Sequence, residues 1–242
     1  MRPNYFGERV AAGYDAETEI SAPAHVDPVV EFLADLAGDG GALEFAIGTG
    51  RIALPLSRRG VRVHGIDLSP DMLAQLQKKP GSDPIDVTLG DIATAEVDGR
   101  FRVVYLVYNT IENLTSQDDQ VSCFCNAAHH LVAGGYFVIE VEVPQLRRLP
   151  PGETVRAFTL SQHHLGFDEF DVAAQHGVSH HYVIAGDRLE RFSMPYRFVW
   201  PSELDLMARI AGLELRERWG DWDRRPFTSE STKHVSVWQK AA

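Results

Sequence analysis

Cysteine, long apolar runs and positive charge are all in short supply in this chain of 242 residues. The two cysteines, Cys123 and Cys125, lie two positions apart on an expected helix, where their side chains do not face each other. A disulfide framework is therefore excluded, and because no Cys/His pair of zinc-binding spacing accompanies them, we expect no metal site. No run of about 18 apolar residues is present, so the sequence predicts no membrane-spanning helix.

The shortage of positive charge limits the kinds of partner. Lys and Arg number 23 against 34 Asp and Glu, which gives a formal net charge of −11. A nucleic-acid groove needs clustered Lys and Arg to neutralise phosphates, so we expect no nucleic-acid substrate. The first 20 residues hold six charges and no apolar segment typical of a secretory signal, so we expect a cytoplasmic protein.

The most informative part of the chain is the segment from Leu43 to Arg51 together with the segment from Val63 to Leu73. The pattern predicts a buried strand, a Gly-rich turn, a helix, and a second strand that ends at Asp67. Backbone N–H groups at such a turn, with a carboxylate at the end of the second strand, suit a cofactor that contains a nucleoside. The sequence therefore predicts a cofactor site at this end of the two strands.

Two cofactors are compatible with this segment. Gly48-x-Gly50-x-x-Ala53 with Asp67 downstream matches a loose dinucleotide pattern, which would indicate a nicotinamide-dependent oxidoreductase. Glu44 lies four residues before Gly48, where a pyrophosphate-binding site does not need a carboxylate. A carboxylate at that point does suit the ammonium and sulfonium groups of S-adenosylmethionine (SAM).

From Leu43 to Leu73 the chain strongly resembles the class I SAM-dependent methyltransferases. Their usual pattern is an acidic residue, then Gly-x-Gly-x-Gly, then an acidic residue at the end of strand two followed by Leu-Ser-x-x-Met-Leu. This sequence departs from the pattern at Ala46, where the first glycine is usual and where the added methyl group needs a little more room. The resemblance is close over residues 40–143, loose over 202–240 and nearly absent over 144–200.

The resemblance implies which residues contact the cofactor. Asp67 would bind the ribose hydroxyls, or would instead cap the following helix. Asp91 would bond the adenine amino group while Ile92 packs on the ring. Asn109, at the end of strand four, would lie near the reacting methyl group or cap a turn. The full expected set is Tyr14, Glu44, Ala46, Gly48, Gly50, Asp67, Leu68, Met72, Asp91, Ile92 and Asn109.

The resemblance also implies the fold. We expect one domain over residues 1–242, a Rossmann-like α/β fold with a seven-stranded mixed sheet, helices on both faces and the last strand antiparallel. An amphipathic helix from Asn4 to Glu19, within an N-terminal lid over residues 1–25, would place Tyr14 near the sulfonium or use it only for packing. Further helices are predicted from Pro28 to Ala37 and from Ser202, as the cap, to Ala211.

Residues 144–200 interrupt the alternation of strands and helices with strand-like segments, which predicts a β-rich insertion after strand five. Pro195 places the last of these strands at an edge or a bulge. Apolar side chains at every second position of this last strand predict one wide apolar face, formed by Phe192, Met194, Tyr196, Phe198 and Trp200. Such a face must cover the acceptor pocket as a lid, the core, or a second copy of the chain in a homodimer.

Methyl transfer from a sulfonium displaces an already activated group, so the protein supplies mainly proximity, orientation and water exclusion. A general base is needed only if the acceptor stays protonated, as a hydroxyl or an ammonium would. The candidate bases are His181 and His176, both in the insertion. We therefore expect an enzyme that O- or N-methylates a small molecule. The alternative is a SAM-binding regulatory or interaction protein without transfer activity, which Ala46 and the lack of a clear base permit.

Overall fold

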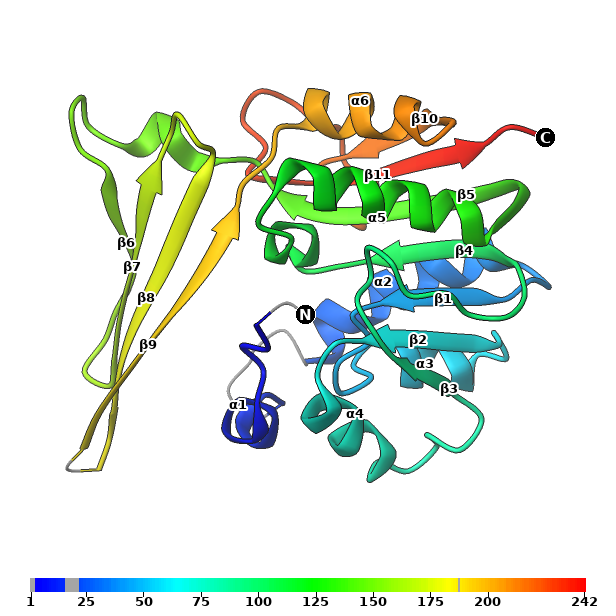
Figure 1. The fold of residues 1–242 in the computed structure, drawn as a ribbon, viewed down its shortest axis with the longest axis horizontal. Helices are drawn as coiled ribbons and strands as arrows, with labels where there is room; N and C mark the ends of the chain where they lie inside the picture. The colour runs from blue at the N-terminus through cyan, green and yellow to red at the C-terminus, as the bar shows by residue number, and fades with distance from the viewer. Residues whose placement is uncertain (1–2, 16–21, 187) are drawn as a thin grey trace.

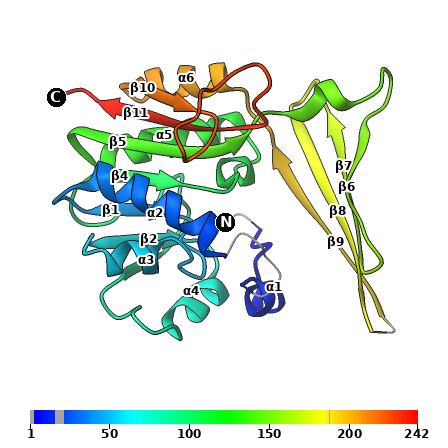
Figure 2. The same cartoon turned by 180° about the vertical axis from the view of Figure 1, so that it is seen from behind.

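The computed structural model describes residues 3–15, 22–186 and 188–242. These residues form a seven-stranded sheet with helices on both faces and a separate four-stranded sheet at one end of it (Figure 1, Figure 2). The arrangement confirms the expected Rossmann-like α/β fold with a β-rich insertion after the fifth strand.

The seven-stranded sheet has the order β10-β11-β5-β4-β1-β2-β3, and β1 to β5 are parallel. The last strand, β11, is antiparallel to both of its neighbours, which confirms the expected mixed sheet. All four residues of β1 are buried, as expected for a central strand covered on both faces. The strands are β1 (Ala42–Phe45), β2 (Val63–Asp67), β3 (Asp86–Leu89), β4 (Phe101–Leu106), β5 (Leu131–Glu142), β10 (Leu213–Trp219) and β11 (Lys233–Lys240).

Two buried apolar clusters flank this sheet. Helices α2 and α3 contribute to the cluster on one face, and α5 and α6 to the cluster on the other. Among the described residues, no helix is both long and apolar enough to cross a bilayer. The helices are α1 (Glu8–Gly13), α2 (Pro23–Ala37), α3 (Ala53–Arg58), α4 (Pro70–Gln77), η2 (Thr110–Asn113), α5 (Gln117–His130), η3 (Gln145–Arg148) and α6 (Pro201–Ile210).

The N-terminal helix is shorter than expected. Before it, the side-chain oxygen of Asn4 accepts a hydrogen bond from the backbone N–H of Phe6 at 2.9 Å, which holds a turn in place of helix. The helix α1 therefore begins only at Glu8 and ends at Gly13. The expected continuation to Glu19 and part of the 1–25 segment lie outside the described residues.

Two other helix predictions were also wrong in their bounds. Helix α2 begins at Pro23 and runs through Pro28, which lacks an N–H for the helical ladder. The burial of one side of α2 against the core outweighs that loss. Ser202 does not cap α6, because the helix begins at Pro201 and Trp200 is its N-cap.

The insertion forms a four-stranded antiparallel sheet, sheet B, in the order β6-β7-β8-β9. Pro195 lies in β9, and β9 is an edge strand, as predicted. Trp200 is not part of the expected apolar face, because β9 ends at Arg197 and the Trp200 side chain is 38% exposed. The strands are β6 (Val155–Leu160), β7 (His164–Asp171), β8 (His176–Ala185) and β9 (Arg188–Arg197).

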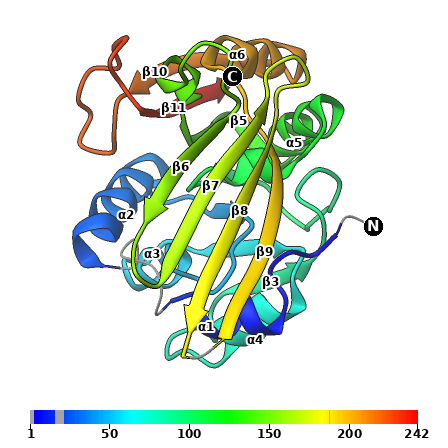
Figure 3. The same ribbon diagram turned by 90° about the vertical axis from the view of Figure 1, so that its left-hand side faces the viewer.

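One face of sheet B, here called its inner face, is turned toward the rest of the molecule. The parallel strands of the main sheet point toward sheet B, and α1 lies beside its far end (Figure 1, Figure 3). On this face Phe170 is in ring contact with Tyr196 and Phe198, and the Glu190 carboxylate forms a 2.7 Å ion pair with Arg9 of α1. Because cross-strand partners share a face, the inner face also includes His181.

A buried guanidinium anchors the end of β9 to the helices. Arg197 is 4% exposed, and its Nη2 lies 2.6 Å from an oxygen of Glu203 in α6. Its Nη1 donates to the side-chain oxygen of Gln120 in α5 at 2.6 Å. These contacts fix the base of sheet B to the face of the main sheet that α5 and α6 cover.

Candidate active site

The Gly-rich turn after β1 has an unusual backbone. Ala46, Gly48 and Gly50 have φ angles of 58°, 56° and 78°, in the left-handed region. A Cβ on Gly50 would lie 2.3 Å from Leu76 Cδ1 and would force that side chain to shift, so this close approach and the left-handed φ together favour glycine. Ala46 has the same left-handed conformation, which glycine adopts more readily than alanine. Alanine at this position therefore has a backbone cost in addition to the room that its methyl group needs.

Asp67 joins the turn to the end of β2. One of its carboxylate oxygens accepts the backbone N–H of Gly48 at 2.7 Å, and the other accepts that of Ser69 at 2.8 Å. Burial raises the pKa of the Asp67 carboxyl. Ser69 caps α4 by accepting the Met72 N–H, so the alternative in which Asp67 caps this helix was wrong.

Glu44 is a buried acid in β1, below the turn. It is 3% exposed, and the Tyr105 hydroxyl donates to its carboxylate at 2.9 Å. Burial raises the pKa of Glu44 to about 8, although the Tyr105 hydrogen bond and the charge of Arg51 act to lower it. The carboxyl therefore holds a proton near neutral pH, and a cation bound beside it would favour its ionised form.

The N-terminal segment is fastened to the same turn. Asp15 accepts a hydrogen bond from the Thr49 hydroxyl at 2.7 Å and forms a 2.6 Å ion pair with Lys79. Burial raises the pKa of the neighbouring Tyr14 phenol. The charge of Arg51 acts to lower that pKa, and the charge of Asp67 acts to raise it further. Tyr14 therefore lies close to the Gly-rich turn, and its position near the sulfonium stays a prediction.

The residues expected around the adenine lie at the ends of β2 and β3. Asp91 follows β3 and accepts the Ala93 N–H at 2.9 Å. Ile92 is buried in the cluster beneath it, Leu68 is half-buried, and the buried Met72 packs under the turn against Gly48. The structure thus brings the cofactor residues expected from the sequence to one edge of the sheet.

The end of β4 is strained and tied to β5. Tyr108 and Asn109 have consecutive positive φ angles of 56° and 60°, which are unfavourable for the Tyr108 side chain, whereas asparagine tolerates this region. The Asn109 side-chain oxygen accepts the Glu142 N–H at 2.8 Å, so its observed role is to hold the backbone. Arg51 lies over the Tyr108 ring at 5.4 Å, which joins this turn to the Gly-rich turn.

Three carboxyl groups from separate elements lie close together beside this strained turn. They are Glu112 of η2, Glu142 at the end of β5 and Asp168 of β7, here called the acidic cluster. Loss of contact with water raises the pKa of all three, that of Glu112 most strongly. Repulsion from the other two acids adds to the shift of Glu112, whereas the charge of Arg156 acts to lower the pKa of Glu142 and Asp168. Burial and the charges of the three acids keep the Tyr196 hydroxyl protonated, because they raise its pKa far above the usual range.

The two histidines considered as bases lie on opposite faces of sheet B. His181 is on the inner face, where its Nδ1 lies 3.0 Å from Nε2 of His164. Burial and the neighbouring histidines lower the pKa of His181 to about 4, so it is a weak base. His176 is exposed at the start of β8 and belongs to the outer face, away from the acidic cluster.

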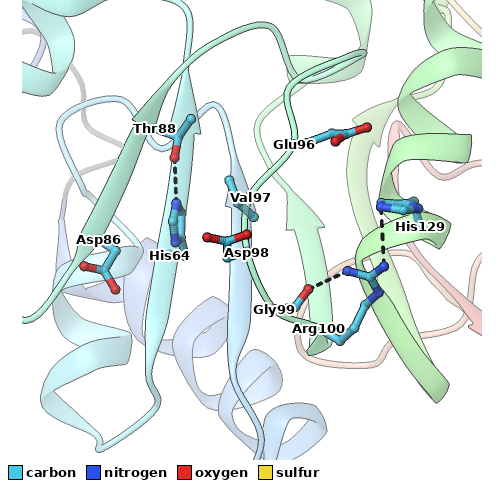
Figure 4. A pocket seen from close by; sticks show the side chains of 9 residues that line it. All are labelled: His64, Asp86, Thr88, Glu96, Val97, Asp98, Gly99, Arg100 and His129. Atoms are coloured by element: carbon cyan, nitrogen blue, oxygen red, sulfur yellow. Dashed lines mark hydrogen bonds between the residues drawn. The ribbon is translucent and has the colours of Figure 1, made fainter.

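A separate open depression of about 720 Å³ lies at the opposite edge of the main sheet (Figure 4). It surrounds the amino ends of the parallel strands, whereas ligands of such sheets bind outside the carboxyl ends. Its hydrogen bonds connect lining residues to one another, as between His64 Nε2 and Thr88 Oγ1 at 2.9 Å. The lining residues are His64, Asp86, Thr88, Glu96, Val97, Asp98, Gly99, Arg100 and His129.

Comparison with known proteins agrees with the fold and with a cofactor site at the Gly-rich turn. Residues 42–135 match the family model described as "Methyltransferase domain". The solved structure of the CcbJ methyltransferase from Streptomyces caelestis is 35% identical, with all of each chain covered and a TM-score of 0.89. The cypemycin N-terminal methyltransferase from a Streptomyces species is 27% identical over 98% of each chain.

More distant structures share the fold. The sugar N-methyltransferase KedS8 from Streptoalloteichus sp ATCC 53650 has a TM-score of 0.69 at 18% identity, and 100% of this chain and 96% of that one are covered. The full-length match at 35% identity decides between the two cofactors considered above, and the nicotinamide-dependent alternative was wrong. The chain belongs to the class I SAM-dependent methyltransferases, and it is an enzyme whose cofactor is SAM.

Proposed function

We propose that this enzyme transfers the methyl group of SAM to an amine nitrogen of a small molecule. When bound, SAM supplies an activated methyl group. Asp67 would accept hydrogen bonds from the ribose hydroxyls, Asp91 would accept one from the adenine amino group, and Glu44 would face the positive charges. The other proposed cofactor contacts are Tyr14, Ala46, Gly48, Gly50, Leu68, Met72, Ile92 and Asn109.

The acidic cluster is the observation that carries the choice of an amine. Glu112, Glu142 and Asp168 are three carboxyl groups around a neutral Tyr196 hydroxyl, and one basic side chain, Arg156, acts on Glu142 and Asp168. A positively charged ammonium would favour the ionised form of these buried carboxyl groups, whereas a neutral hydroxyl would not. Names of relatives support the same choice, since the cypemycin enzyme is named an N-terminal methyltransferase and KedS8 a sugar N-methyltransferase.

The acidic cluster also contains a group that can accept the proton that an ammonium acceptor must lose. An ammonium has no free electron pair, so it must lose a proton before the nitrogen can form a bond to carbon. Burial raises the pKa of Glu112, so its ionised form is a stronger base than an ordinary carboxylate, and an ammonium bound beside it would favour that ionised form. We assign proton acceptance to Glu112, because the low pKa of His181 makes that imidazole a poor base and His176 is on the outer face.

The test compares amine acceptors with hydroxyl acceptors of the same shape. Purified enzyme would be incubated with SAM and matched amine and alcohol panels, and methylated products would be counted by mass spectrometry. We expect products from amines alone. The Glu112→Gln variant should reduce kcat/KM by about 10²-fold or more, the usual contribution of a positioned acid or base.

Glu169→Gln is the matched control, because Glu169 is an exposed residue of β7 on the outer face. Its kcat/KM should stay within about two-fold of the wild type, as surface substitutions usually do. Methylation of alcohols in preference to amines, or equal effects of the two variants, would contradict the amine assignment.

The N-terminal segment and the insertion have proposed roles of their own. We propose that residues 1–25 and residues 144–200 act as lids, the first over the cofactor and the second over the acceptor. Asp15 holds the first segment to the Gly-rich turn, and the inner face of sheet B contributes Asp168 to the acidic cluster. Deleting residues 1–15 should weaken binding of both SAM and acceptor without unfolding the main sheet.

The outer face of sheet B is the proposed surface for a homodimer. Exposed aliphatic side chains lie on it in two cross-strand groups. Light scattering should give twice the monomer mass for the wild type and the monomer mass after Leu189→Glu. We further propose a cytoplasmic enzyme with no nucleic-acid or membrane partner. The exposed aliphatic residues are Leu160, Leu165, Ile184 and Leu189.

A further inference from the structure

Four rings form a row on the inner face of sheet B, at a distance from the acidic cluster. His181 stacks on Phe192, with ring centroids 4.5 Å apart and planes within 7° of parallel. Phe158 lies on the other side of His181 at 5.1 Å, and His164 stacks against His181 at 5.1 Å. These four side chains, from all four strands of sheet B, are here called the ring row.

The row depends on a glycine and is accessible. A Cβ at position 166 would lie 2.3 Å from two ring atoms of Phe158, so Gly166 allows that ring to lie across the strand beside His181. Phe158 is 44% exposed, and His164, His181 and Phe192 are only partly buried. Rings packed only for stability would be covered, whereas these keep surface available for another molecule.

The row shares its face with the acidic cluster. Phe192 and Tyr196 lie four residues apart on β9 and point to the same side, about 13 Å from one another at roughly 3.3 Å per residue. His181 pairs with Phe192, and Ser179, which donates a hydrogen bond to Asp168, pairs with Met194 between them. The face thus leads from charged groups at the Tyr196 end to uncharged rings at the Phe192 end.

The His181 imidazole, which contacts the other three rings of the row, carries no charge that would select an anion. Burial together with the charges of His164 and His180 lowers the pKa of His181 to about 4, so its ring is neutral at pH 7. A neutral imidazole between two phenyl rings provides a flat, polarisable surface suited to aromatic stacking. The polar contact between His164 and His181 is already satisfied within the row.

We propose that the ring row is a second acceptor subsite that binds a flat ring of the substrate. The acceptor is then an elongated molecule, with an amine at the acidic cluster and an aromatic ring roughly 7 to 13 Å away, the distances along the strand from Phe192 to the levels of Asp168 and of Tyr196. This inference rests on the proposed amine methylation, because that assignment fixes which end of the acceptor lies at the cluster.

The experiment uses full-length enzyme, SAM and two series of primary amines. One series consists of ω-phenylalkylamines of increasing tether length, and the other of n-alkylamines of matched length without the ring. The KM of each is measured from S-adenosylhomocysteine formation. For tethers that span roughly 7 to 13 Å, we expect KM to be about three- to ten-fold lower with the phenyl ring, the range for one aromatic pair.

Two variants separate stacking from structural support. Phe192→Leu keeps an apolar side chain and removes the flat ring, so the ring-dependent difference in KM should vanish. Phe167→Leu is the control, since Phe167 stacks on Tyr182 on the outer face, and it should keep the difference. Equal KM values for the two amine series, or equal behaviour of the two variants, would overturn the ring-row inference alone.

A binding measurement covers the case in which no simple amine is methylated. Calorimetric titration of each series into enzyme saturated with S-adenosylhomocysteine reports ring binding without turnover. Tighter binding of the phenyl series that is lost in Phe192→Leu would support the ring row, even if the amine chemistry fails. Absence of any preference for the ring would refute the subsite directly.

Discussion

Binding of SAM should release a proton from Glu44 at neutral pH. The free enzyme holds this buried carboxyl in its protonated form, because burial raises its pKa to about 8. At pH 7 about 0.9 of the molecules are then protonated at Glu44, since one pH unit below the pKa is a ten-fold ratio. A cation placed beside the carboxyl favours the ionised form, so up to about 0.9 proton leaves on binding.

Calorimetric titration measures this release. SAM is titrated at pH 7 in two buffers with different heats of ionisation, and the difference between the observed enthalpies gives the number of protons released. Glu44→Gln removes the titrating group and should abolish most of the buffer dependence. Tyr105→Phe removes the hydrogen bond that stabilises the ionised form, so the pKa of Glu44 should rise and the release should persist to higher pH.

The same shift predicts how stability depends on pH. The pKa of Glu44 is about 8 in the folded state against a usual value of 4.5, so the folded state binds more protons between these values. Stability of the free enzyme should therefore fall as pH rises from 4.5 to 8, and Glu44→Gln should flatten this slope. A proton release that is equal in the wild type and in Glu44→Gln would refute the reasoning.

Three further substitutions test the fold and the cofactor turn. Asp67→Ala should weaken SAM binding by at least ten-fold by calorimetry, the scale of a lost charged hydrogen bond, whereas the exposed Asp83→Ala should not. Arg197→Ala should lower the free energy of unfolding in urea by about 3–5 kcal/mol, because it leaves buried partners unpaired, while the exposed Arg191→Ala should change it little. Ala46→Gly should raise the melting temperature, since it relieves a left-handed backbone worth about 1–2 kcal/mol. No rise after Ala46→Gly would show that the turn is not strained there.

The cofactor half of the site could be predicted because its residues are close in sequence. The turn from Ala46 to Gly50 and the acid at Asp67 belong to one strand–turn–helix–strand unit, so a local pattern determines where they meet. The pattern could not show that Asp67 already accepts two backbone N–H groups, or that Glu44 is buried enough to hold a proton. Those properties depend on the packing of β1 between β2 and β4.

The acceptor half could not be predicted from the sequence. Glu112, Glu142 and Asp168 come from elements distant in the chain, and each alone has the pattern of an ordinary surface acid. Only the return of sheet B toward the main sheet brings them together with Tyr196. Contiguous motifs do not contain this information. The sequence therefore predicted His181 and His176 as candidate bases and did not reveal the acidic cluster.

The two ends of sheet B are held with unequal strength. At its base, the Arg197–Glu203 pair is buried and further joined to Gln120, so separating sheet B from the helices there would leave charged groups without water or partners. At its far end, the ion pair between Arg9 and Glu190 is largely exposed and contributes only about 0–1 kcal/mol. The segment that includes α1 can therefore leave sheet B at little energetic cost while the acidic cluster stays assembled. Opening of the proposed N-terminal lid would instead have to break the contacts of Asp15 with Thr49 and Lys79, which hold this segment to the Gly-rich turn.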